Sequence, residues 1–130
     1  MSTDQLLRGL VDTVMHSPVV TVERNATLRV AARALRQADV GILAVMEGPF
    51  VAGVLSERDV VRGLADGVDP DESQVASVMS AEPRYVTAGA DLSAAAEEML
   101  AAGIRHLPVL DEGELVGIVS MRDLVAVLGG

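Results

Sequence analysis

The sequence Gly-Val-Leu-Ser-Glu-Arg-Asp at residues 53–59 returns as Gly-Ile-Val-Ser-Met-Arg-Asp at residues 117–123, which is 64 positions later. The glycine, the serine, the arginine and the aspartate occupy the same places in both copies. The register extends upstream, because the Val-Met pair at 14–15 matches the Val-Met pair at 78–79 at the same offset. A repeat of this length predicts a fold made of two copies of one structural unit.

Composition limits what such a protein can do. Half of the 130 residues are hydrophobic, but there is one Phe, one Tyr and no Trp, so the core must be aliphatic. The net charge is −9, which argues against nucleic acid or an anionic membrane as the main partner. There is no Cys, hence no disulfide, thiolate metal site or Cys nucleophile. No signal peptide or membrane-spanning apolar run is recognised, and we expect a cytoplasmic protein.

Hydrophobic periodicity predicts the same element order in each half. In the first half we expect a strand at 19–22, a helix at 28–39, strands at 42–46 and 51–55, and a helix at 57–66. Thr27 is placed to cap the first of these helices.

The second half repeats this order. A strand is predicted at 86–87, a helix ends at Gly103 after a cap at Asp91, and strands follow at 106–110 and 115–119. A last helix is predicted from about Met121 to Leu128. The sequence therefore predicts a mixed α/β (α+β) fold of two β-α-β-β-α units.

Four segments are predicted along the chain. Residues 1–10 form an amphipathic lead-in helix, residues 11–66 the first unit, residues 67–74 a polar linker and residues 75–130 the second unit.

The repeated motif has two interpretations. Ser-x-x-Asp after an apolar strand is typical of helix capping, and that role alone explains a single copy. A ligand site is favoured by the strand glycines, which mark close approach of a ligand or of backbone, and by Arg58 and Arg122 in the first helical turn. The alternative for Arg58 is a local ion pair with Asp59 or Glu57. A carboxylate also accepts hydrogen bonds from ribose hydroxyls, and a helix N-terminus favours phosphate.

These features together resemble a tandem pair of CBS domains, a Bateman module. The resemblance runs from about Val11 to Leu128 and includes Gly-Ile-Arg-His-Leu-Pro-Val at 103–109 and Gly-x-x-Ser-x-x-Asp in both halves. It implies two pseudo-twofold-related units packed through their small sheets, with two clefts between the halves. Such modules bind AMP, ADP, ATP or S-adenosylmethionine as regulatory ligands, dimerise, and usually regulate another protein.

The resemblance also implies the ligand-binding residues. In one cleft Ser56 and Asp59 hold the ribose beside Arg58, and the rest of the wall comes from Val86, Thr87, Ile104, Arg105 and His106. In the other cleft Ser120 and Asp123 hold the ribose beside Arg122, with Val20, Thr21, Val40 and Gly41.

The two predicted clefts are unequal. The second unit has Arg105-His106 where the first has Gly41-Ile42, so we expect the Asp59 cleft to bind phosphate-bearing ligands more strongly. His106 is interpreted either as a packed strand histidine or as a ligand contact, and His16 as a surface residue.

We expect no catalysis and no resident metal or cofactor. The two histidines fall in different units, no metal-ligand spacing is present, and neither Ser56 nor Ser120 has the Gly-x-Ser-x-Gly context of a hydrolase. The leading hypothesis is a stand-alone module that senses an adenosine-containing ligand and signals to an unknown effector protein. The alternative is a ligand-free structural or interaction module.

A homodimer is expected through faces of the helices at 28–39 and 92–102. The first helix carries an arginine stripe and the second carries acidic residues, which would suit an antiparallel pairing; the alternative is that these charges form a solvated face. The residues concerned are Arg29, Arg33, Arg36, Glu97 and Glu98.

Overall fold

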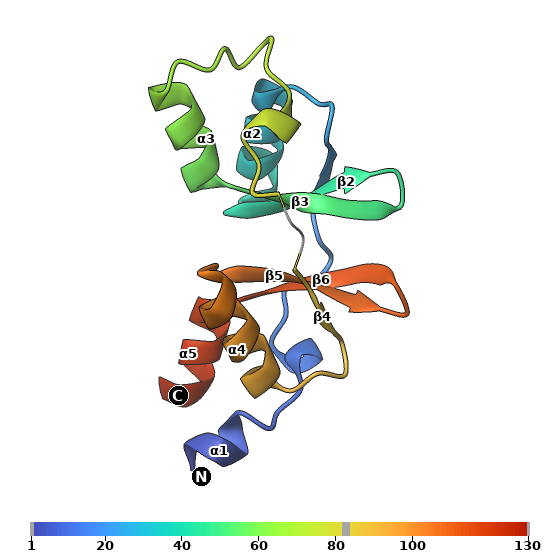
Figure 1. The fold of residues 1–130 in the computed structure, drawn as a ribbon, viewed down its shortest axis with the longest axis vertical. Helices are drawn as coiled ribbons and strands as arrows, with labels where there is room; N and C mark the ends of the chain where they lie inside the picture. Colours follow the sequence, from blue (N-terminus) through green and yellow to red (C-terminus); the bar gives the residue numbers. More distant parts are fainter. Residues whose placement is uncertain (1, 82–83, 130) are drawn as a thin grey trace. The chain divides into compact units, whose positions relative to one another are not determined.

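The chain folds into two compact units. The computed structural model describes residues 2–81 and 84–129; residues 1, 82, 83 and 130 lie outside this part. We call residues 20–83 the continuous unit, and residues 1–19 with residues 84–130 the discontinuous unit. Each unit carries one three-stranded sheet and helices, so the predicted mixed α/β class is confirmed (Figure 1).

The continuous unit has helices on one face of its sheet (Figure 1). The central strand β2 pairs in parallel with β1 and antiparallel with β3, and α2 connects the two parallel strands. Its elements are β1 (Thr21–Glu23), α2 (Leu28–Ala38), β2 (Ile42–Glu47), β3 (Phe50–Ser56), α3 (Glu57–Ala65) and a 3-10 turn, η2 (Val75–Ser77).

The discontinuous unit repeats this arrangement. Strand β5 lies between β4, to which it is parallel, and β6, to which it is antiparallel. Its elements are α1 (Thr3–Leu6), a 3-10 turn η1 (Val11–Thr13), β4 (Val86–Thr87), α4 (Leu92–Ala102), β5 (His106–Asp111), β6 (Glu114–Ser120) and α5 (Met121–Gly129).

Each unit has its own aliphatic core, as the composition predicts. Fully buried leucines, valines and alanines from the sheet and the helices make up both cores. The continuous unit buries Leu28, Ala31, Leu43, Val45, Leu55 and Val75, and the discontinuous unit buries Val11, Ala95, Met99, Leu107, Val109 and Val119.

The two sequence repeats exchange their leading segments. Val11 precedes the first repeat's strand but is buried in the discontinuous unit, while Val75 precedes the second repeat's strand and is buried in the continuous unit. Backbone hydrogen bonds secure both segments to a helix start. The N–H of Leu92 donates to the carbonyl of Gly9 (2.8 Å), and the N–H of Leu28 donates to the carbonyl of Ser73 (3.0 Å). These bonds satisfy donors that a helix N-terminus leaves free.

The predicted helix ends are confirmed. The side chains of Thr27 and Asp91 accept hydrogen bonds from the N–H groups of Val30 (3.2 Å) and Ala94 (2.8 Å). Gly103 ends α4 in a left-handed conformation, with φ of 67°.

Two elements differ from prediction. Strand β1 begins at Thr21 rather than Val19, although the Val20 carbonyl still accepts a hydrogen bond from Ala44 (3.1 Å). The lead-in is helical only over Thr3–Leu6. Beyond it, carbonyl oxygens of the segment accept hydrogen bonds from the first turn of α4, so they do not continue a helical ladder.

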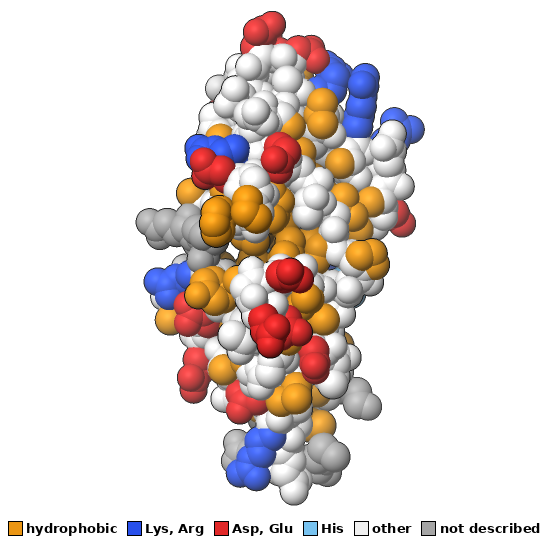
Figure 2. Space-filling model, turned by 90° about the vertical axis from the view of Figure 1, so that its right-hand side faces the viewer, with side chains coloured by type: hydrophobic (Ala, Val, Ile, Leu, Met, Phe, Trp, Pro, Cys, Tyr) orange, Lys and Arg blue, Asp and Glu red, His pale blue; other side chains and the backbone are white. Residues whose placement is uncertain are grey.

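The surface is mainly acidic, in keeping with the net charge. In the view of Figure 2, Asp and Glu side chains are scattered over the face, and arginine side chains lie in a few places, several of them close together near the top. Acidic side chains thus interrupt this face, which differs from the extended basic surface that binds a phosphate backbone.

Candidate functional site

Both copies of the repeated motif form the same hydrogen-bonded structure at a helix start. In the continuous unit, the N–H of Ser56 donates to Oδ2 of Asp59 (2.9 Å), and the N–H of Asp59 donates to Oγ of Ser56 (3.1 Å). In the discontinuous unit, the matching bonds join Ser120 and Asp123 at 2.8 and 3.1 Å. The helix-capping interpretation is therefore confirmed for both copies. Because capping uses one carboxylate oxygen, it leaves the other available for a second role.

The strand glycines are explained by close approach of backbone. A methyl group at Gly53 would collide with the carbonyl oxygen of Ser80, and one at Gly117 would collide with Met15 and lie 3.1 Å from the carbonyl oxygen of His16. Paired backbone hydrogen bonds hold these strands against the exchanged segments, between Val54 and Ser80 and between Ile118 and His16. The glycines therefore give no separate support for a ligand.

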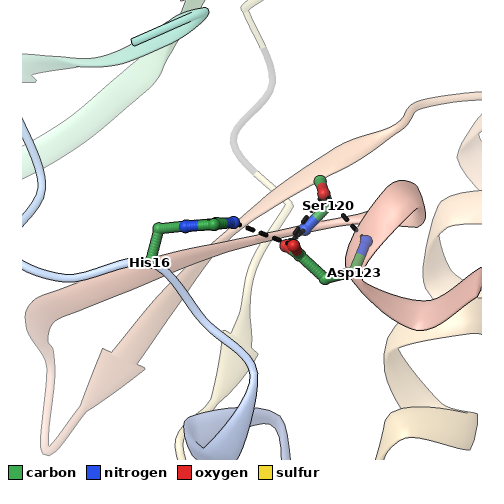
Figure 3. A network of polar contacts seen from close by, with 3 residues as sticks. All are labelled: His16, Ser120 and Asp123. Atoms are coloured by element: carbon green, nitrogen blue, oxygen red, sulfur yellow. Dashed lines mark hydrogen bonds and ion pairs between the residues drawn. The ribbon is translucent and has the colours of Figure 1, made fainter. Parts of the chain in front are cut away.

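The second carboxylate oxygen has different partners in the two units. In the discontinuous unit, Nε2 of His16 lies 2.8 Å from Oδ1 of Asp123, while Oδ2 accepts from both the N–H and the hydroxyl of Ser120 (Figure 3). In the continuous unit, Oδ1 of Asp59 is contacted by Nη1 of Arg62 at 3.4 Å, a long contact from the same helix. The prediction that His16 is a surface residue is confirmed in part: its side chain is 75% exposed, yet it binds the motif.

Sequence reasoning missed this role of His16. The imidazole and the carboxylate are 107 positions apart, and the contact depends on the exchange of the leading segment. The alignment of the two sequence repeats could have drawn attention to it. At the repeat offset His16 aligns with Ser80, so the two units differ at this position.

The motif arginines do not form the local ion pairs that we considered. Among the described residues, neither Arg58 nor Arg122 takes part in an ion pair, and both are exposed. The local partner of Asp59 is Arg62, so the alternative interpretation, an ion pair of Arg58 with Asp59 or Glu57, is not observed among the described residues. The two exposed guanidinium groups in the first turns of α3 and α5 are free to meet a small anion.

The remaining predicted residues lie near the helix starts or on the first strands of the units. The carbonyl of Gly41 accepts from the N–H of Glu57 (3.0 Å), and that of Arg105 accepts from Met121 (2.8 Å). His106 pairs with Ser120 in the sheet. The predicted ligand-binding residues are thus divided between the two units. The continuous unit holds Val20, Thr21, Val40, Ser56 and Asp59, and the discontinuous unit holds Val86, Thr87, Ile104, Arg105, His106, Ser120 and Asp123. That residues of both sets serve one ligand stays a prediction.

The described residues provide neither a metal-binding cluster nor a membrane-spanning helix. Residues 2–81 and 84–129 contain no group of three His, Asp or Glu side chains placed to hold a metal ion. Within the same ranges, no helix combines the length and the apolar character needed to cross a membrane.

Comparison with known proteins gives a consistent result. The family model described as "CBS domain" matches residues 11–66 and 75–130. CBS domain-containing protein YhcV of Bacillus subtilis is 36% identical over 115 residues, which cover 88% of this chain and 81% of YhcV.

Solved structures agree in fold. A CBS domain protein from Pyrobaculum aerophilum, complexed with AMP, has a TM-score of 0.80 and 28% identity, with 93% of this chain and 99% of that chain covered. Hypoxic Response Protein I, with two coordinated zinc ions, has a TM-score of 0.76 and 31% identity, with 90% and 97% covered.

Proposed function

The chain belongs to the CBS domain family as a tandem pair, and from this premise we propose that it is a regulatory module that senses an adenosine-containing small molecule. The ligand class is AMP, ADP, ATP or S-adenosylmethionine, and the binding state is passed to a partner protein. Support for the ligand class comes from the relative of Pyrobaculum aerophilum, whose structure is complexed with AMP.

One observation carries the proposal for this chain: Asp59 is a buried carboxylate at a helix N-terminus with one weakly engaged oxygen. It is the buried charged residue of the described core, at 6% exposure. Its Oδ2 caps α3, and within residues 2–81 and 84–129 the one hydrogen-bond partner of Oδ1 is Nη1 of Arg62, at 3.4 Å. We propose that Oδ1 accepts a hydrogen bond from a ribose hydroxyl, as acidic residues do in dinucleotide folds.

The same helix start suits a phosphate group. The N-terminal end of α3 carries a partial positive charge, and Arg58 adds a guanidinium with no ion-pair partner among the described residues. We therefore propose Ser56, Arg58 and Asp59 as the primary ligand-binding set. The contribution that the family resemblance gives to Arg105 stays a prediction.

A catalytic role is not proposed, although Ser120, Asp123 and His16 are in contact. In a hydrolase triad the histidine lies between the serine and the aspartate, so that it can take the serine proton. Here the carboxylate lies between the other two, and the serine hydroxyl donates to Oδ2 of Asp123 (Figure 3). The histidine therefore has no hydrogen bond through which to activate the serine.

We also propose a homodimer through α2 and α4. Val30 and Leu100 are exposed on these helices, at 49% and 74%, and apolar residues on an exposed helix face suit a partner surface. Two of the charges that motivated an antiparallel pairing have partners within the chain, since Arg29 binds Asp71 and Glu98 binds Arg84. The complementary charges left for such a pairing are Arg33, Arg36 and Glu97.

Calorimetry and thermal denaturation with the four ligands test the proposal. A ligand present at one hundred times its dissociation constant should stabilise the folded protein by about 2.7 kcal/mol. Failure of all four ligands to bind at millimolar concentration would contradict the sensing function and favour the interaction module.

A further inference from the structure

We propose that His16 is a built-in competitor for the ribose site at Asp123, and that it makes the two ligand sites unequal. The proposal rests on the proposed function, because it takes both motif carboxylates as ribose acceptors. His16 lies outside the repeated motif, and its proposed role is to lower ligand affinity at the Asp123 site.

Hydrogen-bond chemistry fixes the role of the imidazole. An ionised carboxylate only accepts hydrogen bonds, so Nε2 of His16 must carry the proton that it donates to Oδ1 of Asp123 at 2.8 Å. Oδ2 already accepts two hydrogen bonds from Ser120. Both carboxylate oxygens of Asp123 thus already accept hydrogen bonds from the protein. A ribose hydroxyl must therefore displace the imidazole from Oδ1 or share Oδ1 with it.

The position of His16 is held by backbone, so the competitor is always nearby. Two hydrogen bonds join His16 to Ile118, with the N–H of His16 donating at 2.8 Å and that of Ile118 donating at 3.1 Å. The side chain extends from this bridge across the end of β6 toward the first turn of α5 (Figure 3). Only the imidazole has to rotate to release Asp123, and it is 75% exposed, so the exchange involves no opening of the core.

The continuous unit supplies the internal control. Ser80 forms the same backbone bridge, to Val54, as His16 forms to Ile118. Among the described residues no hydrogen bond joins the Ser80 side chain to Asp59, whose Oδ1 has only the long contact with Arg62. The two units therefore share a backbone and a carboxylate but differ in the side chain that competes for it.

The test measures binding of adenosine, which presents a ribose without phosphate, and of AMP. An Asp59→Asn background suppresses the other site, so that calorimetry reports the Asp123 site. Adding His16→Ser, which copies the residue of the other unit, should raise adenosine affinity roughly tenfold. This is the low end for a charge-assisted hydrogen bond, because the imidazole is largely in water. The gain should vanish when Asp123→Asn is added.

The matched control reverses the exchange. Ser80→His in the otherwise natural chain should weaken binding at the Asp59 site. His16→Ser should lower the free energy of unfolding by about 1.4 kcal/mol, the same tenfold effect expressed as stability, while the unit stays folded because the backbone bridge to Ile118 remains. In saturating adenosine, the Nε2 resonance of His16 should shift as the imidazole leaves Asp123.

The outcomes separate the two proposals. Equal or weaker adenosine binding after His16→Ser, while the natural chain binds, overturns the competitor role and leaves the sensing function standing. No binding by the natural chain or any variant overturns both.

Discussion

Asp59→Asn and Asp59→Ala should separate the capping role of this residue from its ligand role. The carboxylate accepts the N–H of Ser56 at 2.9 Å, and its side chain is 7% exposed, so water cannot easily replace it. Alanine removes the acceptor and leaves a part-buried donor unsatisfied. We expect Asp59→Ala to lower the free energy of unfolding by about 1–3 kcal/mol.

Asparagine keeps an oxygen in place for Ser56 but removes the negative charge. The loss of stability should then be limited to the interaction with the helix dipole and Arg62, roughly 0.3–1 kcal/mol. Ligand affinity depends on the charge, because a hydrogen bond to an ionised group contributes about 1.5–3 kcal/mol. Both substitutions should therefore weaken AMP binding about ten- to one-hundred-fold.

Urea unfolding monitored by circular dichroism gives the stabilities, and calorimetry with AMP at matched folded fraction gives the affinities. Glu57→Gln is the control, since Glu57 is an exposed acid in the same helical turn and lies outside the capping box. Asp123→Asn should affect affinity less than Asp59→Asn. If Asp59→Asn bound AMP as tightly as the natural chain, Asp59 would be a cap alone and the proposed site would be refuted.

Three further results are expected. Gly53→Ala should lower the free energy of unfolding in urea by the upper part of about 1–3 kcal/mol, because its methyl group would collide with the rigid carbonyl of Ser80. Gly117→Ala should lower the free energy of unfolding by less, because its nearest neighbour is the flexible side chain of Met15. Equal losses for the two variants would contradict this reasoning. The side-chain hydrogen bond from Arg29 lowers the pKa of Asp71, so this pair stabilises the folded protein at a pH above the ordinary carboxyl pKa, and the stabilisation is lost as the pH falls through the lowered pKa. Asp71→Asn should therefore reduce the loss of stability on acidification, measured as the free energy of unfolding against pH. An unchanged loss at acid pH would argue against the pair. Light scattering at tens of micromolar should give the mass of a homodimer, and a monomer mass would remove that proposal.

Local patterns in the sequence were sufficient to predict the order of helices and strands within each repeat. The apolar spacing of α2 and α4, the caps at Thr27 and Asp91 and the stop at Gly103 are all interactions within a few residues. The duplicated motif also correctly predicted a capping box, because Ser-x-x-Asp forms its hydrogen bonds within one helical turn.

What the sequence did not predict depends on segments far apart in the chain. The exchange of leading segments depends on the burial of Val11 and Val75 in cores whose other residues are distant in the sequence. The local hydrophobic periodicity around these two valines does not indicate which core they enter. The same exchange brings His16 to Asp123. The strand glycines had two explanations in the sequence, and only the packed backbone of Ser80 and His16 distinguishes them.

The exchanged segments also impose an order on folding during synthesis. Residues 20–83 are contiguous, so their unit has all its parts as soon as this stretch has left the ribosome. Val11 is synthesised before this stretch, yet its core partners, such as Leu107 and Val119, are synthesised after it. Val11 therefore has no core to enter until β5 and β6 have been translated, and its docking closes a long loop. A chain stalled before β5 would therefore contain every segment of the continuous unit but would leave Val11 without the sheet that buries it.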